Sequence, residues 1–280
     1  CCCRNRTFLY SRIRRIYFMR ADLFLTEKGY VPSRKKAQKL IEDGKVSIDG
    51  HTVQKASQQI GDGEHSVEIL QSDEVRFVGR GGLKLEAALD AFGIDVQDKI
   101  ALDIGASTGG FTDCLLQRGA QKVYAIDAGV GQLAKSLLEN PAVVSIEKLN
   151  ARTLAPEHID HSHANLIVMD VSFISATYII PQFPALMEED GEAVCLVKPQ
   201  FEVGRSMIGK GGIVRDKAAH VDAIKRVCAS ANSVGLAPIA LIPSPIEGGD
   251  GNREFLLHLV REGTQSKLLT EQQILEIATK

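Results

Sequence analysis

The 280-residue chain is predicted to be an α/β protein with a doubly wound, mostly parallel sheet, preceded by a small α+β domain. Three observations predict this. From about residue 100 onward, short apolar segments of strand length alternate with segments of helical pattern. The first of these apolar segments runs into a glycine-rich turn. The first sixty residues are basic and follow a different pattern, which indicates a separate domain.

Charge is divided unevenly along the chain. Residues 1–18 carry five arginines and no acid, and residues 19–60 carry eight Lys and Arg against five Asp and Glu. The whole chain has a net charge of −2, so residues 61–280 must be strongly acidic. A basic front on an acidic body favours a polyanion-binding module at the front, with a merely solvated basic face as the alternative.

Residues 1–18 begin with Cys and contain neither a sustained apolar core nor a small-residue cleavage site. We expect a disordered leader or a mis-assigned start, with the fold beginning at Met19. No apolar run approaches the roughly 18 residues that span a bilayer. The six cysteines form no CxxC pair and no zinc spacing. These features predict a reduced, cytoplasmic protein without a metal site or a stable membrane association, and they leave its oligomeric state open.

The front domain, residues 19–75, is predicted to open with a short helix from Arg20 that ends at Gly29-Tyr30. Ser33 can cap a second helix, 34–42, whose apolar side chains share one face. A strand at 46–48 then leads into an Asp-Gly turn, and another strand is expected at 67–70.

Cations cluster on and around the second helix, which suits binding to phosphates by charge. The alternative is an ordinary amphipathic surface helix. The string "SRKKAQKLIEDGKVSIDGHTV" resembles the RNA-binding domain named after ribosomal small-subunit protein S-four. The resemblance implies RNA contacts from six residues: Arg20, Arg34, Lys35, Lys36, Lys39 and Lys45.

The strongest single signal lies in residues 100–133, which predict a strand, a glycine-rich turn, a helix and a second strand. The turn has the pattern Asp103-x-Gly105-x-Ser107-x-Gly109-Gly110, and its glycines allow a ligand to approach the backbone. The following helix offers free amides at its N-terminus. The second strand ends at Asp127, whose carboxylate is placed to accept hydrogen bonds from a ribose diol.

This pattern distinguishes between two cofactors. The turn lacks the GxGxxG spacing of dinucleotide-binding domains, and the carboxylate of Asp103 would repel a pyrophosphate. The same carboxylate suits a cationic, amine-bearing ligand, which favours S-adenosylmethionine over NAD. A glycine-rich turn without a ligand is the remaining alternative. The expected fold is therefore a Rossmann-like, S-adenosylmethionine-binding domain over residues 80–268, with 76–79 as an interdomain linker and 269–280 as a C-terminal tail.

Further strands are predicted at 143–146, 166–169, 193–197 and 239–242, with helices at 133–138, near 174–186 and at 216–231. Ligands of such sheets bind at the carboxyl ends of the strands. Asn150, Asp170 and Lys198 lie at these ends, so we expect them at the site beside Asp103 and Asp127. Singly, each such charge could be a strand-end residue turned to solvent. Asp170 and Lys198 close neighbouring apolar runs, where an unpaired charge is costly.

A second resemblance joins these residues. With Lys84 in "GRGGLKL" and Glu254 in "NREFLL", the strings "MDVSFIS" and "LVKPQFE" are similar to the FtsJ-like ribose 2′-O-methyltransferases, which use a Lys-Asp-Lys-Glu tetrad. The S-four-type front domain narrows the resemblance to the TlyA family, also called hemolysin A. It implies S-adenosylmethionine as the cofactor, a cytidine ribose 2′-hydroxyl of ribosomal RNA as the acceptor, and ribosomal subunits as partners.

The chemistry of that reaction assigns a role to each residue of the tetrad. A ribose hydroxyl must lose its proton as it attacks the methyl group. We expect Lys198 to accept this proton, with the nearby cation of Lys84 favouring the neutral amine. Asp170 would orient Lys198, and Glu254 would position Lys84 or the ribose.

Alternative functions remain. The chain could be an RNA-binding protein on an inactive methyltransferase scaffold, it could methylate a base or a small molecule, or it could lyse membranes as the hemolysin name suggests. Lysis requires an uninterrupted apolar stripe, which this sequence lacks. The glycine-rich loops at 209–216 and 244–252 could contact RNA or simply be flexible connections.

Overall fold

The computed structural model describes residues 18–31, 33–70, 76–264 and 267–280. It divides into two compact units, Cys1–Val75 and Arg76–Lys280. The expected leader lies outside the described residues except for Phe18. That residue pairs with Gly61 in a strand, so the described fold includes one residue of the expected leader.

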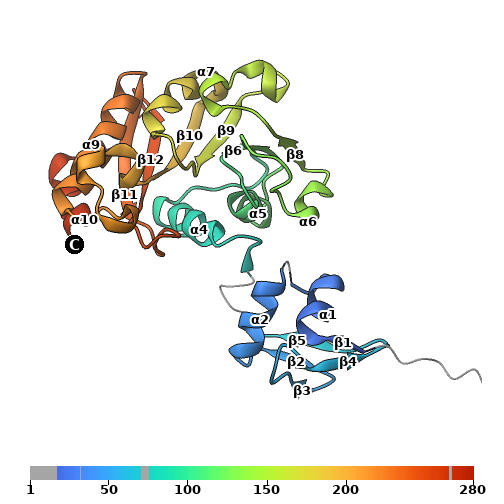
Figure 1. Ribbon diagram of the computed structural model, residues 1–280. Helices are drawn as coiled ribbons and strands as arrows, with labels where there is room; N and C mark the ends of the chain where they lie inside the picture. Colours follow the sequence, from blue (N-terminus) through green and yellow to red (C-terminus); the bar gives the residue numbers. More distant parts are fainter. Residues whose placement is uncertain (1–17, 32, 71–75, 265–266) are drawn as a thin grey trace, which may run out of the picture. The chain divides into compact units, whose positions relative to one another are not determined.

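The front unit contains two helices that pack on each other and two small antiparallel sheets, of strand order β1-β4 and β3-β2-β5 (Figure 1). Its core is formed by apolar side chains of the helices and strands. The elements are β1 (Phe18–Arg20), α1 (Ala21–Glu27), α2 (Arg34–Glu42), β2 (Val46–Ile48), β3 (His51–Thr52), β4 (Gln59–Gly61) and β5 (Val67–Ile69).

The second helix of the front unit confirms its prediction. It covers Arg34–Glu42, and the Ser33 hydroxyl accepts a hydrogen bond from the Lys36 amide at 3.4 Å. Ala37, Leu40 and Ile41 are buried, as their shared face predicts. Strands β1 and β4 were not predicted, because Phe18–Arg20 and Gln59–Gly61 lack the alternating apolar pattern that marks β2.

The second unit is a seven-stranded sheet of order β11-β12-β10-β9-β6-β7-β8, and only β12 runs antiparallel to its neighbours. Its strands are β6 (Ile100–Ile104), β7 (Lys122–Ile126), β8 (Val143–Ile146), β9 (Ala164–Met169), β10 (Met187–Val197), β11 (Leu236–Pro243) and β12 (Phe255–Arg261). Its α-helices are α4 (Gly81–Phe92), α5 (Gly110–Gln117), α6 (Lys135–Leu138), α7 (Phe183–Leu186), α8 (Pro199–Glu202), α9 (Lys217–Asn232) and α10 (Glu271–Thr279).

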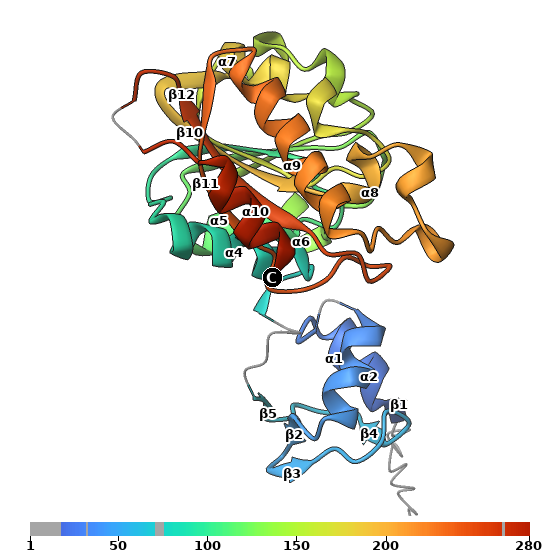
Figure 2. The same ribbon diagram turned by 90° about the vertical axis from the view of Figure 1, so that its left-hand side faces the viewer.

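Helices cover both faces of this sheet. One core cluster joins α4 and α5 to one face, and a larger cluster joins α7, α9 and α10 to the other, where α9 and α10 lie side by side (Figure 2). The chain changes direction in the sheet between β6 and β9. The carboxyl ends of these two neighbouring strands therefore flank the crevice in which doubly wound sheets bind ligands. The predicted doubly wound, mostly parallel architecture is confirmed.

The helix expected near 174–186 was wrong as a single element. The chain instead forms the 3₁₀ turns Ala176–Tyr178 and Ile180–Gln182 and then the short helix α7. Pro181 and Pro184 explain the difference, because each lacks a backbone N–H and disfavours helical geometry in the residue before it. Further 3₁₀ turns are formed by Ala151–Thr153, Pro156–Ile159, Arg205–Met207 and Lys210–Gly212.

Two predicted boundaries also change. Phe77, in the expected linker 76–79, is buried in the core cluster of α4 and α5, and the Val78 amide donates to the Asp113 carboxylate at 2.7 Å. The expected tail 269–280 contains α10, whose Ile274 and Ala278 are buried against the sheet. Both segments belong to the second unit because their apolar side chains complete its core.

Candidate active site

A cavity of about 710 Å³ lies at the carboxyl ends of the parallel strands. Apolar side chains, among them Ile126, Leu149 and Ile179, line part of it. Its size and mixed lining are typical of a site for a cofactor-sized molecule. Five of the predicted cofactor residues line this cavity: Gly105, Ser107, Asp127, Asn150 and Asp170.

The glycines of the turn serve two different purposes. Gly105 has φ +87°, and a Cβ there would lie 2.4 Å from the Asp170 carbonyl oxygen, so only glycine fits between the ends of β6 and β9. Gly109 was expected to approach a ligand. That expectation stays a prediction, and the glycine is also required by packing, because a Cβ on Gly109 would meet Leu137 and Leu133 of the core. Gly110 serves both purposes: its backbone packs against Gly79, and it lines a second, small cavity beside the first.

Asp127 is fixed by the backbone around it. Its Oδ2 accepts a hydrogen bond from the Ser107 amide and its Oδ1 accepts one from the Gly129 amide, each at 2.7 Å. The Ser107 hydroxyl also donates to the side chain of Gln132, a lining residue that was not predicted. The carboxylate therefore has a fixed orientation at the cavity wall, and each oxygen keeps a lone pair for a ligand.

Asp103 does not line the cavity. It is completely buried at the end of β6, where Oδ2 accepts a hydrogen bond from the Thr112 hydroxyl at 2.6 Å and Oδ1 has no hydrogen-bond partner. Burial raises the pKa of Asp103 to about 7, with the charges of Asp170 and Asp127 adding to the effect. The sequence predicted that Asp103 contacts a cofactor directly. In the structure its carboxyl group instead lies behind the residues that line the cavity.

The four tetrad residues form two ion pairs. Lys198, at the end of β10, lies with its Nζ 2.5 Å from Asp170 Oδ1. Lys84, on α4, pairs with Glu254, which directly precedes β12. Three of the four side chains are almost fully buried, and Asp170 is the more exposed member. The predicted Lys84–Glu254 contact is present, and each lysine has its own carboxylate.

Lys198 has a second partner that was not predicted. Its Nζ donates to the Ser172 hydroxyl at 2.9 Å, and both residues line a small cavity of about 210 Å³. This cavity shares Gly105, Ser107 and Asp170 with the larger one. Ser172 lies two residues beyond Asp170 in "MDVSFIS", a position that a strand-end search could have included. A group in the small cavity can thus reach Lys198 and the cofactor-sized cavity together.

The two glycine-rich loops are joined by one buried amide. Asn252 is 1% exposed; its Oδ1 accepts from the Val214 amide at 3.0 Å and its Nδ2 donates to the Gly212 carbonyl at 2.9 Å. Glu254 follows two residues later. The loops at 209–216 and 244–252 are therefore fixed to each other beside the tetrad, and a purely flexible connection does not describe them.

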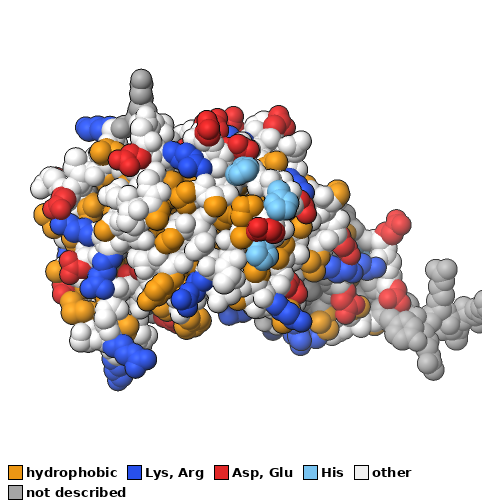
Figure 3. Space-filling model, turned by 90° about the horizontal axis from the view of Figure 1, so that it is seen from above, with side chains coloured by type: hydrophobic (Ala, Val, Ile, Leu, Met, Phe, Trp, Pro, Cys, Tyr) orange, Lys and Arg blue, Asp and Glu red, His pale blue; other side chains and the backbone are white. Residues whose placement is uncertain are grey.

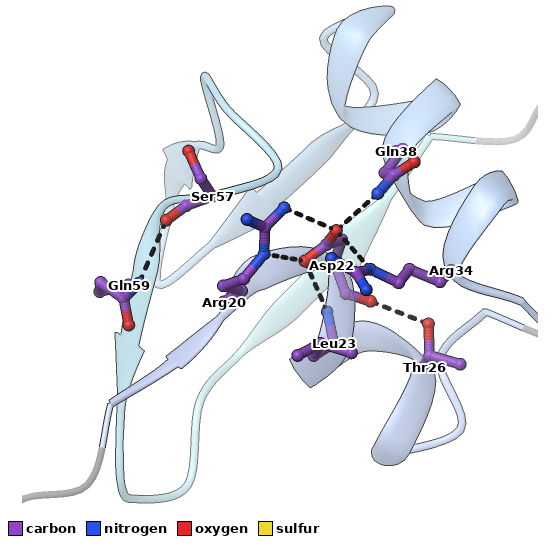
Figure 4. Close-up of polar contacts among 8 residues, drawn as sticks. All are labelled: Arg20, Asp22, Leu23, Thr26, Arg34, Gln38, Ser57 and Gln59. Atoms are coloured by element: carbon purple, nitrogen blue, oxygen red, sulfur yellow. Dashed lines mark hydrogen bonds and ion pairs between the residues drawn. The ribbon is translucent and has the colours of Figure 1, made fainter.

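In the front unit, two of the predicted RNA-binding arginines have a structural role. Arg20 and Arg34 both bind the buried carboxylate of Asp22, which also accepts hydrogen bonds from Gln38 and from the Leu23 amide (Figure 4). The Arg20 guanidinium, more than any other group, holds the pKa of Asp22 well below its usual range. Both arginine side chains nevertheless remain partly exposed.

The four predicted lysines lie around α2. Lys35 is exposed at its start, Lys36 is half-buried, and Lys39 pairs with Asp43 at 2.7 Å. Lys45 lies 4.0 Å from the same carboxylate. On the face of the molecule seen in Figure 3, by contrast, acidic, basic and apolar side chains are interspersed.

Comparison with known families identifies both units. The model of FtsJ-like methyltransferases matches residues 77–261, and the S4 domain model matches residues 19–65. The chain belongs to the FtsJ-like methyltransferase family. Its relatives place it in the TlyA, or hemolysin A, group of that family, as the sequence motifs predict.

Three relatives show the extent of the likeness. The 16S/23S rRNA (cytidine-2′-O)-methyltransferase TlyA of Mycobacterium tuberculosis is 42% identical over 240 residues, covering 86% of this chain and 89% of its own. Hemolysin A of Brachyspira hyodysenteriae is 42% identical over 242 residues, covering 86% and 100%. A solved structure from Streptococcus thermophilus matches with a TM-score of 0.71 and 38% identity, covering 94% of both chains.

Two features are absent from the described residues: a helix that could span a membrane and a cluster of side chains that could hold a metal ion. Among residues 18–31, 33–70, 76–264 and 267–280, no helix is long and apolar enough to cross a membrane. Within the same described parts, no group of three or more His, Cys, Asp and Glu side chains is arranged to hold a metal ion.

Proposed function

We propose that this FtsJ-like methyltransferase transfers a methyl group from S-adenosylmethionine to a cytidine ribose 2′-hydroxyl of ribosomal RNA. The observation that carries the proposal is the Lys198–Asp170 pair, which lies where the small cavity meets the cofactor-sized one. The ribosomal substrate and the cytidine rest on the TlyA relative from M. tuberculosis. A cytoplasmic location and ribosomal subunits as partners follow from the same proposal.

The residues of the larger cavity fit S-adenosylmethionine. Asp127 offers fixed acceptors for a ribose diol, and Asn150 with the apolar wall suits an adenine. The free Oδ1 of Asp103 and the carboxylate of Asp170 provide negative charge for a cationic ligand. Gly105, which lines the cavity, allows β6 and β9 to end close together.

The bound cofactor supplies an electrophilic methyl group, and the side chains act on the hydroxyl that receives it. Asp170 and Ser172 hold the Lys198 Nζ in place, and once that nitrogen has released a proton to solvent, its neutral amine accepts the hydroxyl proton. The Lys84–Glu254 pair fixes the start of α4 against β12, beside the same cavity. Because two reactants are held in one geometry, positioning contributes much of the rate.

The front unit would bind the RNA. Its exposed Lys35 and the outward parts of Arg20 and Arg34 are the groups best placed to contact phosphates, with Lys36, Lys39 and Lys45 around them. Such contacts orient the RNA without selecting a sequence.

Tritium transfer from labelled S-adenosylmethionine to free ribosomal subunits, assembled ribosomes and naked rRNA tests the proposal, followed by mapping of the methylated ribose. Lys198→Ala should lower turnover by about a hundredfold to ten-thousandfold, the usual contribution of a general base. Lys135→Ala, at a lysine whose side chain is 86% exposed on α6, is the matched control and should leave turnover unchanged.

Near-normal turnover by Lys198→Ala would refute its role as the base. Wild-type protein that binds S-adenosylmethionine and rRNA but labels none of these substrates would favour an RNA-binding protein on an inactive scaffold. Transfer to a base or to a small molecule instead of a ribose would contradict the proposed acceptor.

A further inference from the structure

The loop at 244–252, between β11 and β12, leads directly into a residue of the tetrad. The Ser244 amide donates to the Glu254 carbonyl at 2.9 Å, so the two ends of the loop are paired. The loop contains three glycines, which give its backbone unusual freedom. Glu254 is nevertheless only 2% exposed, and its carboxylate pairs with Lys84. The geometry of this ion pair therefore depends on how the loop is held.

One of these glycines, Gly248, lies directly against the Glu254 carboxylate. A Cβ on Gly248 would be 2.6 Å from Glu254 Oε1, so the loop backbone forms part of the wall around this acid. The Gly248 amide donates to the Asn252 carbonyl at 2.8 Å, which folds the loop back on itself. If the loop opened, water would reach the carboxylate, and the attraction between two charges is much weaker in water than in the protein interior. The closed loop thus keeps Glu254 bound to Lys84.

The Asn252 side chain holds the loop closed. It is 1% exposed and both ends of its amide are bonded, since Oδ1 accepts from the Val214 amide and Nδ2 donates to the Gly212 carbonyl. Val214 is itself fixed, because its carbonyl accepts a hydrogen bond at 2.9 Å from Nε2 of His220, a buried residue of α9. Asn252 therefore connects a glycine-rich loop to a helix of 16 residues.

The residues on either side of Glu254 are anchored as well. The Arg253 guanidinium donates to two backbone carbonyls near the end of α10. The Phe255 ring is fully buried, and its centre lies 5.7 Å from that of His220. These contacts fix the start of β12. The closure of the loop that precedes it depends on Asn252.

The Lys84–Glu254 pair is coupled to the other half of the tetrad. Lys84 lies in the first turn of α4, three residues after Gly81. A Cβ on Gly81 would be 3.7 Å from Asp170 Oδ2, so the start of α4 packs beside this carboxylate. A shift of α4 would therefore change the surroundings of the Lys198–Asp170 pair. A displacement of about 1 Å at an active site can lower the rate by about a hundredfold.

We propose that Asn252 is a positioning residue of the methyl transfer, which holds the loop at 244–252 closed over the Lys84–Glu254 pair. The inference rests on the proposed function and adds to it a residue outside the tetrad. Asn252 lines neither the cofactor-sized cavity nor the small one. Its effect therefore reaches the reactants through Glu254.

Asn252→Ala tests this role on the RNA that the wild-type protein methylates. It should lower kcat by about tenfold to a hundredfold, while KM for the RNA and the affinity for S-adenosylmethionine stay within about twofold. Asn252→Asp keeps the acceptor for the Val214 amide, so it should recover part of the loss. Asn140→Ala is the matched control, because it removes a side-chain bond to the Ala142 amide between α6 and β8, and it should change none of these values.

A double variant separates positioning from a general loss of stability. Glu254→Gln removes the charge that the closed loop surrounds. If Asn252 acts through Glu254, adding Asn252→Ala to Glu254→Gln should lower kcat by less than about twofold further, because coupled effects do not multiply. A loss of folded protein would lower kcat by the same factor in both backgrounds.

Three outcomes would overturn the assignment. A kcat of Asn252→Ala within about twofold of the wild type shows that the loop needs no such anchor. Equal factors in the two backgrounds show that Asn252 stabilises the fold without acting on Glu254. Both results leave the proposed function intact. If the wild-type protein methylates no RNA, the proposed function fails and the assignment fails with it.

Discussion

Among the described residues, each unit contains one completely buried aspartate. The two aspartates have very different hydrogen-bond partners. Asp22 in the front unit is bound by Arg20, Arg34, Gln38 and a backbone amide. Asp103 in the second unit has one hydroxyl partner, Thr112, and an oxygen with none. The pKa of Asp22 is held well below its usual range, while burial raises the pKa of Asp103 to about 7.

The difference separates a structural charge from a functional one. Asp22 has all its partners within the fold, so its charge stabilises the junction of α1 and α2. Burial of Asp103 without a counter-charge costs stability, and we propose that a cationic ligand in the neighbouring cavity offsets this cost. An unpaired buried acid at a strand end therefore marks a binding site more reliably than a paired one does.

The largest effect is expected from Asp22→Asn. Neutralising Asp22 weakens its charge-assisted hydrogen bonds to Arg20 and Arg34, and hydrogen bonds to charged groups contribute about 1.5–3 kcal/mol each. Amide hydrogen exchange should accelerate in β2 of the front unit and stay unchanged in β9 of the second. The folded pKa of Asp22 is lowered, so its stabilisation is complete above about pH 4 and is lost as the pH falls.

Asp43→Asn is the matched control, because it removes an exposed ion pair with Lys39 that is worth at most about 1 kcal/mol. Equal exchange in both variants would show that Asp22 contributes no more than a surface charge.

Asp103→Asn should stabilise the second unit, whereas Asp22→Asn should destabilise the front unit. The folded state retains this proton between about pH 4 and pH 7 while the unfolded state releases it, so the wild-type unit loses stability as the pH rises through this range. The variant avoids a cost of up to about 4 kcal/mol at pH 8. Urea unfolding without cofactor should show a more stable variant at pH 8 and nearly equal stabilities at pH 4.

The same substitution should weaken S-adenosylmethionine binding, measured by calorimetry at pH 8. A variant that is more stable and binds the cofactor as well as the wild type would contradict the functional role of Asp103.

The smallest effects are expected from substitutions of the cations of α2. They separate a residue that only binds RNA from one that also stabilises the front unit. Lys35→Gln should weaken RNA binding a few-fold and lower the salt dependence by about one counterion, without a change in stability. Arg34→Gln should weaken RNA binding and also destabilise the front unit, because Arg34 binds Asp22. Filter binding at several salt concentrations, together with thermal unfolding, measures both. If the two variants are equally stable, the contact of Arg34 with Asp22 does not stabilise the front unit.

Much of the fold was predictable where local signals agreed. The helix at 34–42 has a capping serine and an apolar face. The strands at 100–104 and 143–146 are mostly apolar, each with one polar residue, Asp103 and Ser145. The single helix predicted near 174–186 was wrong. The apolar pattern of this segment is that of a helix, but its two prolines interrupt helical geometry. Helix α10 was not predicted because its few apolar residues become a face only when packed on the sheet.

The sequence by itself determined the class of the fold and the glycine-rich turn, because periodicity and backbone freedom are local properties. The four tetrad residues were implied by the resemblance to the FtsJ-like family. Only the tertiary structure decided that Ser172 is a second partner of Lys198, that a Cβ on Gly109 would meet Leu137, and that Asp22 is satisfied while Asp103 is not. These outcomes depend on contacts between residues that are far apart in the sequence, as Ser172 and Lys198 are. Such contacts are fixed by how the strands and helices pack.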